Sequence, residues 1–391
     1  MSVFDQLIGQ GHIVSALSDA ITSARNGGET QEMTHAWLFT GPPGSGRSSA
    51  ALAFAAGLVC PQGGCGDCIE CRTALDGIHG DVEVIKTEGL SIKIDEIREL
   101  LVRVAWAPSV APWRVVVMED ADRLTESAGN ALLKAIEEPG ASTVWLLCAP
   151  TLHDVLPTIR SRARHLQLRT PSTEDVTQVL IERDGVSPAM ADFAARASQG
   201  HIGRARHLAT DDAVRSRRNS IMKLPFGLSN IASAYKAAGV LVDLATAEAN
   251  AFSEVKDEQE SQELAQAWGQ GATGRGMVSG GSKALKELEK EQKSRATRMV
   301  RDSLDGSLLD LATLYRDVMM AQAGISDTFI NNDLAEQVLR LAQNTTPEAT
   351  LEKIAAIMQA RTNLSFNSAP LLTMEALMCI LAEPSHHASA V

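Results

Sequence analysis

Residues 41 to 49, which read GPPGSGRSS, have the residue types and spacing of a phosphate-binding loop. Such loops follow the pattern G-x-x-x-x-G-K-[ST], which Gly41, Gly46 and Ser48 match, while Arg47 occupies the lysine position. Glycines let backbone N–H groups converge on phosphate oxygens, and the helix that follows adds its positive N-terminus. The sequence therefore indicates a loop that can hold ATP or ADP with Mg²⁺. Its residues are Gly41, Pro42, Pro43, Gly44, Ser45, Gly46, Arg47, Ser48 and Ser49. The alternative is a Gly/Pro-rich turn that binds nothing.

Two acidic residues follow the apolar stretch RVVVM. Glu119 and Asp120 stand at the C-terminal end of an expected strand, where parallel sheets place their ligand crevice. A nucleotide-hydrolysing site uses an Asp here for the metal and a neighbouring Glu for water, and this chain has the reverse order. Asp120 is one methylene shorter than the usual base, and the guanidinium of Arg47 is bulkier than an ammonium. Hydrolysis is therefore in doubt. Alternatively, these acids only end a strand and lead into a helix at Thr125.

Four of the six cysteines lie within twelve residues, in CPQGGCGDCIEC. Cys60, Cys65, Cys68 and Cys71 have spacings short enough to close around one tetrahedral ion, and the intervening glycines permit the sharp turns. We expect a structural Zn²⁺ site, because four thiolates leave no open coordination position. Redox pairing is the alternative. The other two cysteines, Cys148 and Cys379, lie in apolar segments and resemble ordinary buried thiols.

The charge and composition of the chain exclude some classes of protein. A formal net charge of −12 argues against binding DNA through bulk electrostatics. No uncharged stretch reaches the ~20 residues of a membrane span, and the N-terminus has no basic, apolar leader. We therefore expect a cytoplasmic protein with no membrane partner. Aromatic residues make up only 4%, which favours an α/β or α-rich architecture.

The chemistry-bearing segments lie in a region that alternates strand-like and helical patterns, up to about residue 170. AWLFT, DVEVIK, RVVVMED and TVWLLCAP are the expected strands, and IDEIRELLVRVA and SAGNALLKAIEE are expected helices between them. This alternation predicts a parallel sheet with helices on both faces. The chain downstream of TPSTEDV is helical in character.

The helical region divides into a small bundle, about 173 to 224, and a larger group, about 225 to 385. A Gly/Ser-rich segment at 268–283 interrupts the larger group and is expected to be a flexible loop. The following stretch, KALKELEKEQKSRATRMVRD, has many charges and few apolar residues. It predicts a solvated helix, with a partner-binding helix as the alternative.

The order of the segments resembles that of AAA+ clamp-loader ATPases of bacterial DNA polymerase III. The matching segments are FDQLIGQ, GPPGSGRS, the cysteine cluster, VVVMEDAD, NALLKAIEEP and TIRSRAR. The resemblance is dense up to about residue 210 and sparser beyond, where NLSFNSAPLLTMEALMCIL is similar to a helix of the collar domain through which these subunits form a pentamer. It implies an α/β fold: an AAA+ P-loop parallel sheet (1–170, with the cysteine knuckle at 60–71), a helical lid (171–224) and an all-α collar (225–391).

The resemblance also implies roles for single residues in TIRSRAR. Ser161 and Arg162 fall on a Ser-Arg-Cys motif, whose arginine reaches the γ-phosphate of ATP in a neighbouring subunit. Ala163 stands in place of the cysteine, which leaves the role of the arginine intact. The alternative is a surface arginine beside Arg160 and Arg164.

Two further positions weaken the chain's own nucleotide site. The polar sensor residue that follows the fourth strand in the family falls at Ala149 or Pro150, which cannot hold a water. The lid arginine that contacts ATP in active subunits falls at Gly203, next to Arg204. A site with these departures resembles a relic that can still bind nucleotide.

The resemblance therefore implies a non-motor subunit that helps load the sliding clamp onto primed DNA and supplies an arginine finger to an adjacent ATPase. Its expected partners are gamma/tau and delta clamp-loader subunits in a heteropentamer, with the sliding clamp and primer–template DNA met through the complex. One alternative is an ATP-hydrolysing, gamma/tau-like motor subunit. Another is a zinc-dependent binding module with an inactive nucleotide domain.

Overall fold

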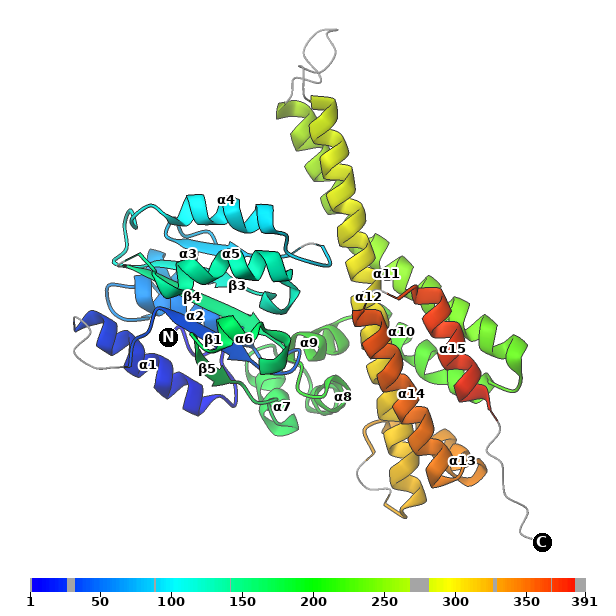
Figure 1. Cartoon of the computed structure of the whole chain (residues 1–391). Coiled ribbons are helices and arrows are strands. Elements are labelled where there is room, and N and C mark those ends of the chain that lie inside the picture. Colours follow the sequence, from blue (N-terminus) through cyan, green and yellow to red (C-terminus); the bar gives the residue numbers. More distant parts are fainter. Residues whose placement is uncertain are drawn as a thin grey trace. The chain divides into compact units, whose positions relative to one another are not determined.

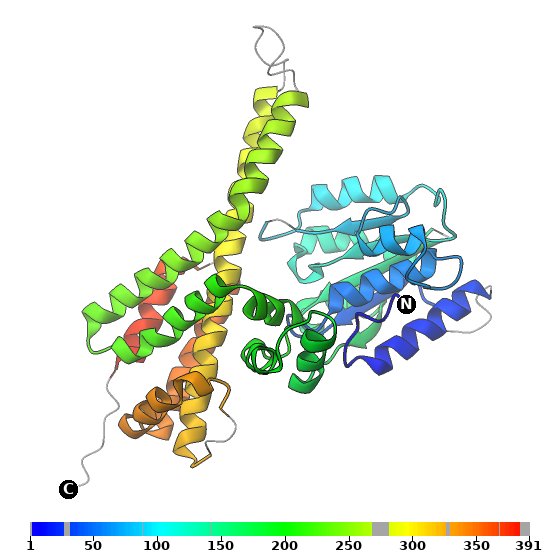
Figure 2. The same cartoon turned by 180° about the vertical axis from the view of Figure 1, so that it is seen from behind.

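The computed structural model of the chain describes residues 2–26, 32–87, 89–140, 142–267, 281–325, 329–366 and 368–383. The chain divides into two units, Met1–Thr210 and Asp211–Val391, each with its own hydrophobic core (Figures 1 and 2). The separate lid at 171–224 stays a prediction.

A five-stranded parallel sheet forms the centre of the first unit. The strands are β1 (Ala36–Thr40), β2 (Val82–Ile85), β3 (Arg114–Met118), β4 (Thr143–Ala149) and β5 (Arg164–Gln167), in the order β2-β3-β4-β1-β5. All neighbouring pairs are parallel, which confirms the predicted class of sheet. Four strands were expected from the sequence. The fifth, RHLQ, was not, because this edge strand is polar and carries no apolar run.

Successive residues of the central strands point to opposite faces of the sheet, and both faces are buried. Trp37 and Phe39 of β1 join the core on one face, and Leu38 joins the core on the other. The first face is covered by α1 (Gly11–Arg25), α2 (Arg47–Val59) and α3 (Ile69–Leu75). The second is covered by α4 (Ile94–Val104), α5 (Glu126–Glu137) and α6 (Pro157–Arg160). The unit is therefore a three-layer α/β/α structure, as the alternating pattern predicted.

Three helices complete the first unit: α7 (Thr173–Glu182), α8 (Pro188–Ser198) and α9 (Ile202–Thr210). Ser172 begins α7 as its N-cap, and its hydroxyl accepts a hydrogen bond from the N–H of Asp175. The Asp175 carboxylate in turn accepts from the N–H of Ser172, so the two residues form a capping box. Short 3₁₀ helices lie at Ala121–Arg123 (η1) and Leu152–Asp154 (η2).

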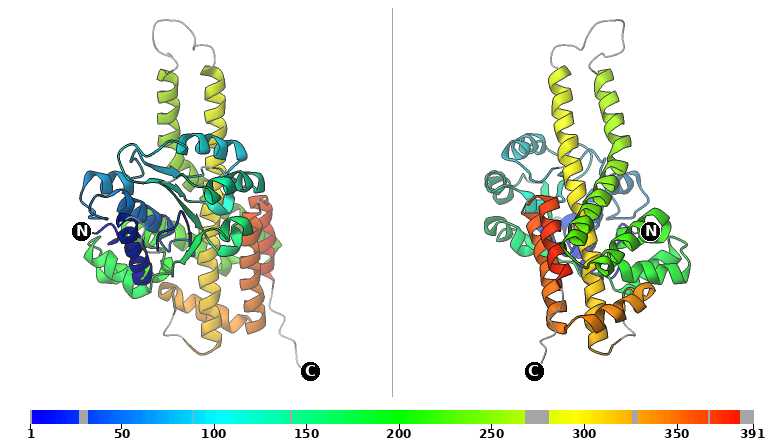
Figure 3. Two further views of the ribbon diagram at one scale, coloured as in Figure 1. Left: turned by 60° about the vertical axis from the view of Figure 1, so that its left-hand side comes forward. Right: turned by 90° about the vertical axis from the view of Figure 1, so that its right-hand side faces the viewer.

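The second unit is entirely helical in its described part, as expected for the region after about residue 225. Its elements are α10 (Asp212–Lys223), η3 (Leu224–Gly227), α11 (Ile231–Ala267), α12 (Gly281–Gln322), η4 (Asn332–Leu334), α13 (Ala335–Asn344), α14 (Pro347–Ser365) and α15 (Pro370–Ala382). Helix α11 packs against α12 and α15, and α12 also packs against α13 and α14. The outer halves of α11 and α12 form a hairpin beyond the other helices of this unit (Figure 3).

The predicted Gly-rich loop at 268–283 lies outside the described residues up to residue 280, and α12 begins at Gly281. The charged stretch after it is helical, as predicted, but it is not solvated on all sides, because one of its faces packs on α11. Among the described residues, no helix combines the length and apolar composition needed to cross a membrane.

Candidate functional site

The phosphate loop connects β1 to α2, which is the predicted setting. Gly44 and Gly46 have φ angles of +82° and +90°, a backbone conformation that other residues rarely adopt. The loop is held from outside, since the N–H of Gly41 donates to the carbonyl of Pro150 at 3.1 Å. The side chain of Gln10 contacts the carbonyls of Ser45 and Arg169. The first turn of α2 has N–H groups without helical acceptors, so the loop has the form of a phosphate cradle.

A cavity of about 340 Å³ opens over this loop. Its lining combines loop residues from Gly44 to Ser49 with the N-terminal segment Gln6–Ile8 and with α9 and the end of α7. Arg183 and Arg206 line it, as do His201 and Gly203. Sequence reasoning had placed Gly203 here but missed both arginines. The cavity therefore offers positive charge to an anionic ligand, although Arg206 also pairs with Asp184 at 2.7 Å.

His201 packs directly on the phosphate loop. A Cβ atom added to Gly44 would lie 2.3 Å from Cγ of His201, so only glycine fits at this position. The Nδ1 atom of His201 accepts a hydrogen bond from the N–H of Arg204. Burial lowers the pKa of His201, and the nearby Arg204 guanidinium adds to this effect. A neutral imidazole thus lies against the loop.

Two buried polar atoms of the loop have no hydrogen-bond partner among the described residues: Oγ of Ser45 and Nη1 of Arg47. The guanidinium of Arg47 lies close enough to the acidic end of β3 to influence it. Burial raises the pKa of Asp122, Asp120 adds to this, and Arg47 is among the groups that oppose it. The unpaired donor and the loop geometry fit a phosphate group, so the residues present can hold a nucleotide.

Glu119 and Asp120, the two acids assigned to the nucleotide site from the sequence, lie at the end of β3, and each has a basic neighbour. The Oε1 atom of Glu119 lies 3.0 Å from Nζ of Lys86, so its carboxylate is already paired. Asp120 caps η1 and lies 4.0 Å from Arg123. At the sensor position, Ala149 ends β4 and is buried, and Pro150 contributes only its carbonyl. Neither Ala149 nor Pro150 offers a polar side-chain atom at the sensor position.

Arg162 and the phosphate loop lie at opposite ends of the parallel strands. The loop follows the C-terminal end of β1, whereas Arg162 precedes the N-terminal end of β5, which pairs with β1 in parallel. Its Nε donates to Oε1 of Glu137 at 2.5 Å, and its Nη1 donates to the Thr158 carbonyl and to Oγ of Ser161. The Arg162 side chain is 39% exposed. It does not line the cavity above the loop.

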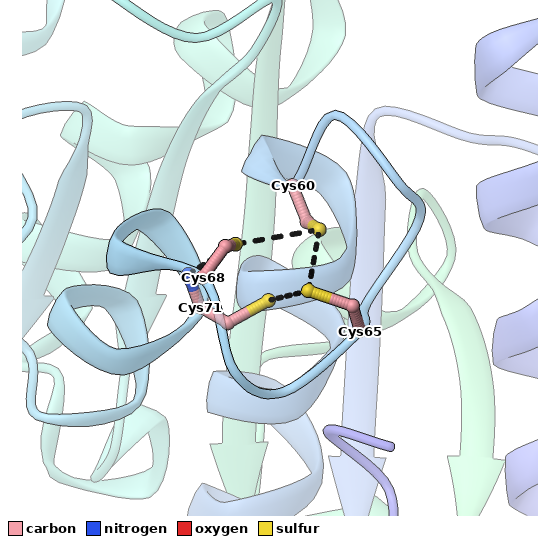
Figure 4. A group of neighbouring side chains, drawn as sticks. All are labelled: Cys60, Cys65, Cys68 and Cys71. Carbon is pink, nitrogen blue, oxygen red and sulfur yellow. Dashed lines mark hydrogen bonds between the residues drawn. The ribbon is translucent and has the colours of Figure 1, made fainter. Parts of the chain in front are cut away.

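The four predicted metal ligands lie together at the end of α2 and the start of α3 (Figure 4). Their sulfur atoms are separated by 3.8 Å between Cys60 and Cys65, 3.7 Å between Cys60 and Cys68, and 4.0 Å between Cys65 and Cys71. All four lie within 4.8 Å of one another. A regular tetrahedron with Zn–S bonds of ~2.3 Å has edges of ~3.8 Å. The sulfurs are too far apart for disulfides, and the cluster can bind a metal ion.

Backbone N–H groups support negative charge at Cys60 in this cluster, whereas burial raises the pKa of Cys71 and of Cys68. Gln62, Gly66 and Cys71 direct their N–H groups at the sulfurs of Cys60, Cys71 and Cys68. Burial raises the pKa of Cys60, but nearby backbone N–H groups outweigh it and lower the pKa to about 6. Gly63, Gly64 and Gly66 all have positive φ, which confirms the expected sharp turns.

Comparisons with known proteins place this combination of a nucleotide-type loop, cysteine cluster and helical C-terminal unit. The family model described as "DNA polymerase III, delta subunit" matches residues 17–172, and its C-terminal counterpart matches residues 297–378. Together they cover more than half of the chain. DNA polymerase III subunit delta' of Bacillus subtilis is 27% identical over 91% of this chain and 93% of its own length. The chain belongs to the delta-prime family of DNA polymerase III subunits.

Other relatives match a smaller share of the chain. The delta' subunit of Pseudomonas aeruginosa is 37% identical over 35% of this chain and 43% of its own length. The gamma/tau subunit of Mycobacterium tuberculosis is 34% identical over 42% of this chain but only 28% of its own length. Residues 173–296 lie between the two matched family models.

Proposed function

We propose that this chain is the stator of a DNA polymerase III clamp loader, a subunit that helps to load the sliding clamp onto primed DNA. It contributes Arg162 to the ATP of an adjacent gamma/tau subunit and does not turn over ATP itself. The observation that carries this proposal is the position of Arg162, at the end of the strands opposite to the chain's own loop. The length of a four-residue strand, ~13 Å, separates the two ends. Arg162 therefore cannot serve the nucleotide of its own chain.

The hydrogen bonds of Arg162 leave part of its guanidinium available. Nε and Nη1 have partners in the chain, whereas Nη2 has none among the described residues. An exposed ion pair such as Arg162–Glu137 contributes at most ~1 kcal/mol, so it does not prevent the guanidinium from turning to a neighbour. A planar guanidinium offers paired donors to phosphate oxygens, and such an arginine supplied in trans accelerates phosphoryl transfer by ~10³- to 10⁵-fold.

The second unit carries apolar side chains that suit assembly with other subunits. Leu351 and Met358 lie seven residues apart on one face of α14 and are 61% and 45% exposed. Phe366, which follows α14, is 81% exposed, and Leu372 on α15 is 67% exposed. Large apolar side chains that are exposed in this number are candidates for a protein interface. They support a collar that joins delta and gamma/tau subunits in a heteropentamer.

An apolar surface at the end of α4 suits a further protein contact. Val102 and Trp106 are 68% and 74% exposed, and Val110 in the following segment is 75% exposed. An exposed tryptophan is the residue type that most often anchors an interface. This surface belongs to the first unit, so the proposed assembly does not rest on the collar alone.

We propose that the four cysteines hold one structural Zn²⁺. The near-tetrahedral sulfur spacing and the N–H donors that favour thiolates support zinc, and a closed set of four thiolates leaves no position for a substrate. When bound, the ion would fix the loop between α2 and α3.

The experiment that tests the stator role uses the complex assembled with gamma/tau and delta subunits. Arg162→Ala should leave assembly intact by size exclusion and lower DNA-stimulated ATP turnover by at least ~10³-fold at the site it serves. Arg162→Lys should restore little of the loss. The matched control is Arg160→Ala, since His153 is the one hydrogen-bond partner of the Arg160 side chain among the described residues. Unchanged turnover and clamp loading by the assembled Arg162→Ala complex would remove the basis of the proposal.

A further inference from the structure

The hairpin formed by the outer halves of α11 and α12 is a distinct part of the second unit. Both arms run side by side beyond α13, α14 and α15 (Figures 1 and 3). The outer arm of α12, up to residue 296, precedes the matched C-terminal family model, which begins at residue 297. Neither matched family model therefore covers this arm.

A polar contact between the two arms fixes the orientation of α12. Arg295 is only 8% exposed and donates to the carboxylates of Asp257 and Glu260 on α11, at 2.5 and 3.1 Å. The side chain of Gln292 donates to the carbonyl of Asp257 at 3.0 Å. The hydrogen bond from Arg295 lowers the pKa of Glu260, so this carboxylate stays charged. Asp257 and Glu260 are thus both held by Arg295 within the hairpin.

Four lysines lie on the side of α12 away from this contact. Lys283, Lys286, Lys290 and Lys293 are all exposed, and we call them the lysine stripe. Their spacing of three, four and three residues confines them to ~80° of the helix circumference and ~15 Å of its length. The next outward position, one turn further, is the uncharged Thr297.

Acidic residues flank the lysine stripe, and among the described residues one ion pair joins them to it. Lys283 lies 3.7 Å from Glu287, and both side chains are largely exposed, so this pair is weak. The other three lysines form no ion pair with any described residue. At 100° per residue, Glu287 and Glu289 lie ~40° to either side of the stripe, and Glu291 lies ~80° from Lys283. The stripe therefore presents four exposed ammonium groups on one side of α12, with glutamates at its flanks, on a chain whose net charge is −12.

We propose that the lysine stripe binds the phosphate backbone of duplex DNA. Duplex DNA carries one negative charge per ~1.7 Å of its axis, so four ammonium groups spread over ~15 Å face several phosphates at once. Lysine is a point charge without base-reading geometry, so binding will be independent of sequence and sensitive to salt. The choice of DNA over an acidic protein rests on the proposed function, in which the chain works at primed DNA.

The test measures binding of the full-length chain to a fluorescently labelled duplex of ~30 base pairs by anisotropy at 50 mM salt. Lys286→Glu/Lys290→Glu/Lys293→Glu should weaken binding at least ~10-fold, because three counterion-releasing contacts become repulsive. The control Arg98→Glu/Lys236→Glu/Arg340→Glu makes the same change in net charge at exposed sites elsewhere, and it should change affinity less than ~3-fold. Lys286→Gln/Lys290→Gln/Lys293→Gln provides the same test should charge reversal disturb the hairpin.

The salt dependence gives a second readout. A plot of the logarithm of the association constant against the logarithm of salt concentration should have a slope of about −3.6 for the unaltered chain. For the stripe variants the magnitude of this slope should be smaller by ~3. Three results would overturn the proposal. They are no binding of the duplex by the unaltered chain at 50 mM salt, equal losses in the stripe and control variants, or a stripe variant that retains DNA binding but fails to assemble with the other subunits. The last result would assign the stripe to an acidic protein surface. None of these assays depends on Arg162 or on ATP turnover.

Discussion

Glu137 on α5 accepts a hydrogen bond from Nε of Arg162 at 2.5 Å, and this contact joins two segments that are 25 residues apart. The carboxylate holds the stem of the arginine while Nη2 remains available. Glu137→Gln should therefore lower ATP turnover of the assembled complex by ~10-fold or less, well short of the loss caused by Arg162→Ala. The measurement is DNA-stimulated phosphate release. Glu138→Gln is the control, since among the described residues no hydrogen bond or ion pair joins this neighbour to Arg162. An equal effect of both variants would contradict a positioning role for Glu137.

The chain alone should bind nucleotide without hydrolysing it at rates typical of ATPases, ~1 s⁻¹ or faster. Arg47→Lys should not restore turnover, because Glu119 remains paired with Lys86 and Ala149 supplies no polar group. Binding of a fluorescent ATP analogue and phosphate release, measured on the same sample, check both statements. Rapid turnover that disappears in Arg47→Ala would contradict the prediction.

Gly44→Ala should abolish nucleotide binding, since the new Cβ would lie 2.3 Å from His201 and the backbone has φ +82°. Gly185→Ala is the matched control. Its backbone is also in the left-handed region, with φ +69°, but no atom lies within 4 Å of the added Cβ. Equal loss of binding in both variants would show that backbone strain alone, and not the contact with His201, is responsible.

The protein purified without chelator should contain about one Zn²⁺ per chain. Cys68→Ser should remove the metal and lower the melting temperature, because a closed thiolate site contributes to folding free energy. Cys379→Ser, in the second unit, should retain the metal. Elemental analysis and thermal unfolding provide the two readouts. A metal-free sample with an undisturbed melting temperature would exclude the metal site.

Asp81 should make stability depend on acidic pH. Its buried carboxylate accepts from the N–H groups of Ser109, Val110 and Ala111 at 2.7 to 2.9 Å. Burial raises its pKa, but these donors outweigh the effect and lower the pKa to about 2. Because the pKa in the folded state lies below the unfolded value of ~3.9, the stabilisation is complete above about pH 4. It is lost as the pH falls towards 2.

Asp81→Asn should therefore reduce the free energy of unfolding by about 2 kcal/mol at pH 7. The difference should shrink as the pH falls from 4 to 3 in urea unfolding curves. Asp95→Asn, at a site that is 80% exposed, should have little effect at either pH. A difference between Asp81→Asn and the unaltered chain that is independent of pH would rule out the charge of this carboxylate as the cause.

Local patterns predicted most of the fold and of the metal cluster. The ligands of the cluster lie within twelve residues, so spacing alone brings them together. The strands β1 and β3 are apolar on both faces, which only a covered parallel sheet explains. The edge strand β5 was missed because pairing with β1, rather than its own apolar content, makes it a strand.

The lining of the cavity could not be predicted, because its arginines come from helices far along the chain. Arg183 and Arg206 reach the loop through the packing of α7, α8 and α9, which no local pattern specifies. The polar contact in the hairpin was also missed. A charged helix predicts solvent exposure, and only the complementary acids on α11 explain how Arg295 is buried.

The glycines of the phosphate loop have a consequence for how such motifs persist in evolution. Gly41 lies against Leu168 and Ser45, Gly44 lies against His201, and the helix that starts at Arg47 ends at Val59, next to Cys60 of the cysteine cluster. Gly41 and Gly44 are thus required by the packing of the domain, and Gly46 by its backbone φ of +90°, whether or not a nucleotide is ever cleaved. Purifying selection on the fold will preserve the motif in lineages that have abandoned hydrolysis. Survival of these glycines in a genome is therefore a record of ancestry and architecture, and the neighbouring acids and sensor residues carry the record of catalysis.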